Sequence, residues 1–94
     1  MLQAAVKVDP QSPEAHNFLG SALASRGRTQ EAIGQFRLAL SLRPKYPNAR
    51  FNLGNALVKS GKLDEAIAEY KRILETNPDD ELTKDRLNAV LNRS

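Results

Sequence analysis

The sequence lacks the side chains on which most enzyme active sites and metal sites depend. It has no cysteine, and His16 is its only histidine. Without cysteine there can be no disulfide framework, zinc–thiolate site or thiol nucleophile, and one imidazole is too few for a histidine metal site. The five glycines are isolated from one another, so no phosphate-binding loop is indicated. We therefore predict no cofactor, no metal ion and no enzymatic activity.

Long apolar runs are also missing. No stretch approaches the ~18 apolar residues of a membrane helix, and the first residues lack the basic-then-apolar order of a secretion signal. These absences predict a cytoplasmic protein without membrane contact. The net charge is +3, from 14 Lys and Arg against 11 Asp and Glu. Because the two signs interleave and aromatic residues are few, nucleic acid is a poor candidate partner.

What the sequence does contain is an internal repeat. Residues 13–46 and 47–80 share twelve identical residues when they are aligned without gaps. Each unit carries two apolar series at helical spacing, and Gly27 or Gly61 separates the two series. Glycine at this place suits the left-handed conformation that ends a helix. No segment alternates as a half-buried strand does, so we predict pairs of helices and an all-α protein.

This pattern resembles the tetratricopeptide repeat, whose large and small apolar residues recur at fixed places before a closing proline. The residues that carry the resemblance are Leu19, Gly20, Leu23, Ala32, Phe36, Ala39 and Pro44 in one unit, and Leu53, Gly54, Leu57, Ala66, Tyr70, Ile73 and Pro78 in the next. The chain departs from the family at two places. It has His16 and Arg50 where the first helix usually has tryptophan, and Ile73 stands where a small residue is usual late in the second helix, which should push the next helix slightly outward. The resemblance implies a right-handed helical solenoid of antiparallel helix pairs that mediates protein–protein interaction.

We interpret residues 1–94 as a single domain with two full repeats and flanking half-repeats. Its parts are the tail of a partial repeat (1–12), two repeats (13–46 and 47–80) and a terminal capping helix (81–94). Many residues of the last helix are polar, as the end of a solenoid requires. Asp79, Asp80 and Glu81 stand where that helix begins, so we expect them to cap it and not to bind a metal.

Several positions are predicted to serve packing alone. Gly20 and Gly54 should lie where paired helices cross closely, and a larger side chain there would cost about 1–3 kcal/mol. Gly34 should face solvent. His16 occupies a packing position without a neighbouring catalytic partner, so we expect a structural histidine.

The inner face of the solenoid is the predicted partner-binding groove. By helical spacing and by the resemblance, it should be lined by Asn17, Phe18, Ser21, Phe51, Asn52, Asn55, Lys59 and Arg86. Amide side chains can bond the backbone of a peptide whatever its sequence, so we expect a protein or peptide partner. For Phe18 and Phe51 the alternative is that each ring fills space between helices.

Some tetratricopeptide proteins hold the terminal carboxylate of a peptide with a lysine, two asparagines, a second lysine and an arginine. The corresponding residues here are Asn17, Ser21, Asn52, Leu82 and Arg86. Only Asn52 and Arg86 match, and both lysines are missing. Because the cations contribute most to carboxylate binding, we expect no clamp of this kind.

Self-assembly is the alternative function. Residues 1–12 align with the end of a unit and residues 81–94 with its beginning, so the two ends could complete each other between chains. The predicted self-assembly edge consists of Leu2, Ala5, Val6, Leu87 and Leu91. Such a contact would form dimers or head-to-tail oligomers.

Overall fold

The computed structural model describes residues 9–93, in which all regular secondary structure is α-helical. The helices are α2 (Pro13–Ser25), α3 (Thr29–Leu42), α4 (Pro47–Lys59), α5 (Leu63–Thr76) and α6 (Glu81–Arg93). None of these helices is long and apolar enough to cross a membrane. Leu2, Ala5 and Val6, which belong to the predicted self-assembly edge, lie outside the described residues.

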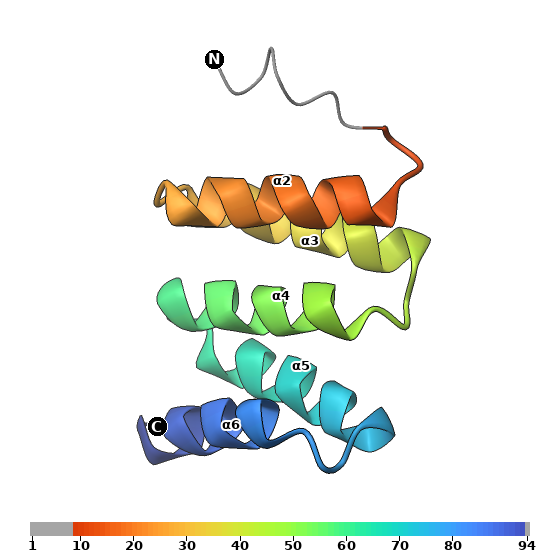
Figure 1. Ribbon diagram of the computed structural model, residues 1–94. Coiled ribbons are helices and arrows are strands. Elements are labelled where there is room, and N and C mark those ends of the chain that lie inside the picture. Colours follow the sequence, from red (N-terminus) through yellow and green to blue (C-terminus); the bar gives the residue numbers. More distant parts are fainter. Residues whose placement is uncertain (1–8, 94) are drawn as a thin grey trace.

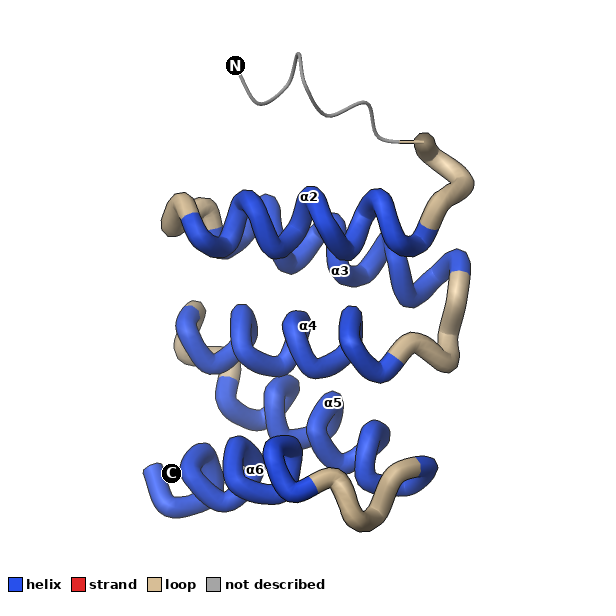
Figure 2. The backbone as a smooth tube through the Cα atoms, viewed as in Figure 1, coloured by secondary structure: helices blue, strands red, loops and turns tan. Residues whose placement is uncertain are grey.

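The helices form a stack of antiparallel pairs. In Figure 1, α2, α4 and α6 run in one direction, and α3 and α5 run back in the opposite direction. The helix α3 packs against both α2 and α4, and α5 packs against both α4 and α6. The tube in Figure 2 shows that short loops connect successive helices. The described part of the chain measures 41 × 25 × 18 Å, an elongated all-α solenoid as predicted.

The turns inside the two pairs are built around glycine, as the sequence predicts. Gly27 and Gly61 have φ angles of 80° and 82°, in the left-handed region that other residues avoid. In the first turn, the N–H of Arg28 donates to the carbonyl of Leu23 at 3.0 Å, and the second turn repeats this bond. This closing pattern satisfies carbonyl groups that the end of the helix leaves without a partner.

Ring-on-glycine contacts hold each pair of helices together. A Cβ atom on Gly20 would lie 2.5 Å from Cε1 of Phe36, and one on Gly54 would lie 2.6 Å from Cε1 of Tyr70. Both rings are only 1% exposed, so they have little room to move. The predicted close crossings are confirmed. Gly34 is exposed, and a Cβ there would have no atom within 4 Å, which confirms that it faces solvent.

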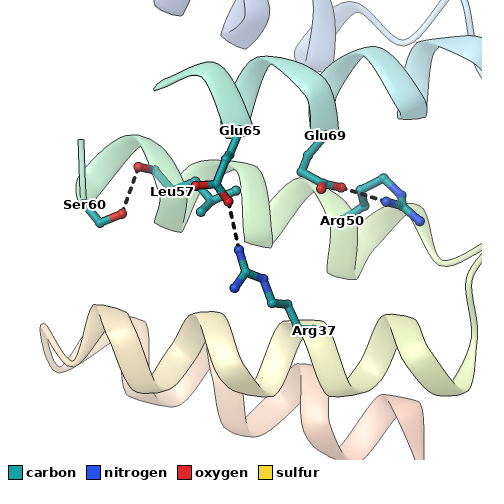
Figure 3. A network of polar contacts seen from close by, with 6 residues as sticks. All are labelled: Arg37, Arg50, Leu57, Ser60, Glu65 and Glu69. Atoms are coloured by element: carbon teal, nitrogen blue, oxygen red, sulfur yellow. Dashed lines mark hydrogen bonds and ion pairs between the residues drawn. The ribbon is translucent and has the colours of Figure 1, made fainter. Parts of the chain in front are cut away.

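Two ion pairs connect the helices on the side drawn in Figure 3. Arg50 of α4 lies 2.7 Å from Glu69 of α5, within one repeat, and both side chains are mostly buried. Arg37 of α3 lies 3.0 Å from Glu65 of α5, between repeats, but both side chains are more than half exposed. An exposed pair contributes less than about 1 kcal/mol. The pair within the repeat is therefore the more important contact for stability.

Candidate functional site

An open groove of about 510 Å³ lies across the three parallel helices. Most of its polar and charged wall comes from α2, α4 and α6, namely Ser21, Ser25, Asn52, Asn55, Lys59, Arg86 and Arg93, and Thr29 of α3 adds a hydroxyl. Apolar atoms of Ala56, Val58, Ala89 and Val90 lie between these groups. The sequence places the predicted partner-binding groove on these same helices, and binding of a partner there stays a prediction.

The predicted groove residues divide into those that line the groove and those that support it. Five of the predicted residues line the groove: Ser21, Asn52, Asn55, Lys59 and Arg86. The other three, Asn17, Phe18 and Phe51, do not belong to its wall.

Asn17 supports the groove through a chain of hydrogen bonds between α2 and α4. The Nδ2 atom of Asn52 donates to Oδ1 of Asn17 at 3.0 Å, and Asn17 in turn donates to the hydroxyl of Tyr46 at 3.3 Å. A weaker contact of 3.5 Å joins Asn52 to the hydroxyl of Ser21. These bonds fix the Asn52 side chain with its carbonyl oxygen free of any hydrogen bond from residues 9–93.

Tyr70 fixes the side-chain amide of Asn55 through a hydrogen bond. Because Gly54 has no side chain, the Tyr70 ring lies against it, and the hydroxyl donates to Oδ1 of Asn55 at 2.5 Å. Burial raises the pKa of Tyr70, and the positive charge of Arg86 partly opposes this effect. Since its oxygen accepts from Tyr70, Asn55 has both amide hydrogens available, with no acceptor among residues 9–93.

The two phenylalanines have different environments. Phe51 is partly buried against the core, with its ring centroid 5.9 Å from that of Tyr70 at an interplanar angle of 52°. The guanidinium carbon of Arg86 lies 5.9 Å from the Phe51 centroid, within the range of a cation–π contact. Phe51 therefore fills space between helices and positions Arg86. Phe18 is 61% exposed and does neither.

Some lining residues were missed from the sequence. Ser25 and Arg93 occupy the same register as Lys59, one repeat before it and one repeat after it, so the repeat itself was the signal that could have found them. Phe36 and Tyr70 reach the groove from α3 and α5. The sequence signal that could have found them is the glycine at which each ring packs, Gly20 for Phe36 and Gly54 for Tyr70.

The remaining predicted positions are explained by packing and capping. His16 is 7% exposed, and its Nδ1 lies 2.7 Å from Oε1 of Gln35, so it is a packed structural histidine as predicted. Asp80 caps α6, because one oxygen of its carboxylate accepts from the backbone N–H of Thr83 at 3.4 Å and the other accepts from the Thr83 hydroxyl at 2.9 Å. Within residues 9–93, no three potential ligands among His, Asp and Glu come close enough together to hold a metal ion.

Two residues of the predicted self-assembly edge lie in α6. Leu87 is partly buried and packs against the core, whereas Leu91 is 45% exposed.

A stack of antiparallel helix pairs with a groove along its first helices defines a helical repeat protein. Residues 23–85 match the tetratricopeptide repeat family, and the chain belongs to this family. No curated protein matches the sequence.

Solved structures of tetratricopeptide proteins have the same fold. A crystal structure of MamA is 27% identical, with a TM-score of 0.86 over 89% of this chain and 49% of that one. A second MamA structure is also 27% identical, with a TM-score of 0.85 over 89% of this chain and 46% of that one. The chain thus spans about half the length of these MamA chains. The first TPR of Spaghetti (RPAP3), bound to the HSP90 peptide SRMEEVD, is 27% identical, with a TM-score of 0.87 over 90% of this chain and 68% of that one.

Proposed function

We propose that the protein is a non-enzymatic interaction module that binds a peptide or an extended protein segment in the groove over α2, α4 and α6. One observation carries the proposal: Asn52 and Asn55 present complementary groups in the groove. Asn52 offers a carbonyl oxygen and Asn55 offers amide hydrogens, since their other groups are bonded to Asn17 and Tyr70. The two residues are one helical turn apart, so they are neighbours on the helix surface. An extended backbone presents matching donors and acceptors.

The family comparison supports a peptide ligand of some kind. A similar tetratricopeptide structure carries a bound HSP90 peptide. The details of that ligand do not transfer to this chain, because Asn17 and Leu82 stand where carboxylate-binding relatives have lysine. Asn17 is moreover bonded to Asn52 and Tyr46. We therefore propose binding through the backbone and side chains of the ligand, without a need for its free C-terminus.

The test is selection of short peptides from a random display library, followed by titration of the selected peptides against variants. We expect Asn52→Ala and Asn55→Ala each to weaken binding about tenfold, since each substitution removes a hydrogen bond to the ligand. Asn88→Ala is the matched control, because Asn88 is an exposed amide on α6 outside the groove wall. Failure to select any peptide would contradict the proposal, and so would equal binding by all three variants.

Self-assembly is a second proposal, supported by the exposure of Leu91. An apolar side chain that is 45% exposed on the last helix could pack against another chain, with the partly buried Leu87 beside it. The mass of the protein in solution distinguishes the two proposals.

A further inference from the structure

The charges in the groove all have one sign. Lys59, Arg86 and Arg93 line it, and none of the described residues in its wall is acidic. The ion pairs within residues 9–93 use other cations, namely Arg28, Arg37, Arg43, Arg50 and Lys84. The three groove cations therefore have no carboxylate partner in the described part of the chain. They bring three positive charges into one groove of a protein whose net charge is +3.

The position of these cations follows from the repeat. Lys59 and Arg93 are one repeat apart and occupy the same register at the ends of α4 and α6, which run in parallel in Figure 1. Arg86 lies about two turns before Arg93 on the same helix. The equivalent residue on α2 is Ser25, so the positive charge belongs to the α4–α6 half of the groove. The half on α2 is uncharged.

Arg86 is positioned before any ligand arrives. Its guanidinium carbon lies 5.9 Å from the Phe51 ring centroid, and Phe51 is held in turn by packing against Tyr70. A guanidinium that already rests on an aromatic ring loses less side-chain entropy when it binds a carboxylate. The alanine and valine atoms between the cations suit small apolar side chains of a ligand.

We propose that the groove selects an acidic segment in extended conformation, whose Asp and Glu side chains pair with Lys59, Arg86 and Arg93. This inference rests on the proposed function and specifies its ligand. Charge-assisted hydrogen bonds to carboxylates are stronger than neutral ones, and complementary charge determines which partner is accepted. The acidic residues of the segment lie over α4 and α6, and its uncharged part lies over α2. The carboxylates are side chains within the segment, because cations are missing at the positions of Asn17 and Leu82.

The experiment is a selection with two display libraries of random peptides, one with a free C-terminus and one embedded between fixed sequences. We expect both libraries to give peptides with two or more carboxylates. Synthetic versions with blocked ends should bind, and replacing their Asp and Glu by Asn and Gln should weaken binding by about tenfold or more. Binding should also weaken as salt is raised from about 50 to 300 mM.

Matched variants locate the interaction. Lys59→Gln and Arg93→Gln should each weaken binding of the acidic peptides by about fivefold to tenfold. Both side chains are exposed, so these variants should fold normally, which helical circular dichroism checks. Lys71→Gln removes the same charge from an exposed position on α5, outside the groove wall, and should leave affinity unchanged.

The outcomes separate this inference from the function on which it rests. Selection of neutral or basic peptides would overturn the inference and leave peptide binding intact. Selection from the free C-terminus library alone would show a terminal carboxylate site and would overturn it too. A single-stranded oligonucleotide that displaced the acidic peptides at lower concentration would show a nucleic-acid groove instead. No selected peptide in either library would contradict the proposed function itself.

Discussion

Arg50 in the second repeat and His16 in the first stand at equivalent positions and make equivalent contacts. Arg50 donates to Glu69 of the partner helix at 2.7 Å, and to the carbonyl of the proline before its own helix at 2.8 Å. His16 lies 2.7 Å from Gln35 of its partner helix and 3.3 Å from the carbonyl of the equivalent proline. Where the family usually has tryptophan, this chain thus uses a polar bridge between two helices and the preceding turn.

The bridge of the second repeat should contribute measurably to stability. Arg50→Met keeps most of the apolar stem but leaves the Glu69 carboxylate, on a side chain only 22% exposed, without its partner. We expect a loss of about 2 kcal/mol in the free energy of unfolding, since hydrogen bonds to charged groups are worth about 1.5–3 kcal/mol. Urea unfolding followed by circular dichroism measures it. A loss smaller than that of an ordinary neutral hydrogen bond, below about 0.5 kcal/mol, would show that solvent replaces the bridge.

A double variant tests the cause of that loss. Arg50→Met combined with Glu69→Leu removes both charges and leaves no unpaired carboxylate, so it should be more stable than the sum of the two single losses predicts. Additive losses would mean that the two side chains act independently.

The crossing at Gly54 should tolerate no side chain. Gly54→Ala would press the new methyl against the Tyr70 ring, which is buried and bonded to Asn55. We expect a loss of about 1–3 kcal/mol in the free energy of unfolding. Gly34→Ala is the control, because that position is exposed and open, and there alanine should stabilise the helix by up to about 1 kcal/mol. Thermal and urea unfolding of both variants measures these changes in stability. Equal changes in the two variants would contradict the prediction and would show that the crossing is loosely packed.

These elements show how far the sequence predicts the structure. The fold is predictable because glycine in the turns and proline in the first turn of a helix act locally, and because these residues and the small residues at the helix crossings recur from one unit to the next. The direction in which groove residues face is predictable from helical register. Their hydrogen-bond partners are not, because these come from other helices: Asn17 bonds to Asn52, and Asn55 bonds to Tyr70. Register also could not show that Phe51 lies beneath Arg86 while Phe18 remains exposed.

Tyr70 should make stability depend on pH at the alkaline end. Burial raises its pKa above the ordinary value of about 10, so the folded protein keeps the phenol proton at a pH where the unfolded chain has lost it. The stabilisation from this group is therefore fully present below pH of about 10 and is lost as pH rises through the higher folded pKa.

Comparison with Tyr70→Phe isolates this contribution from that of the lysines, which titrate in the same range. At neutral pH the variant should be about 1 kcal/mol less stable, because it lacks the hydrogen bond to Asn55. Above pH of about 10 the difference should shrink, since only the wild type has a phenol at this position to ionise on unfolding. Urea unfolding at several pH values measures both curves. If the two curves stay parallel, ionisation of Tyr70 does not cause the loss of stability at alkaline pH.

The mass in solution decides between the groove and the chain ends as the main functional surface. Fully burying one leucine contributes about 1.5–3 kcal/mol, whereas a dissociation constant of about 1 mM already requires about 4 kcal/mol. Leu91 is partly covered within its own chain, so it cannot by itself hold a dimer at micromolar concentration. If the groove is the main functional surface, we expect light scattering to give the mass of a single 10.4 kDa chain across that range. A larger mass that falls in Leu91→Glu would instead support self-assembly through α6.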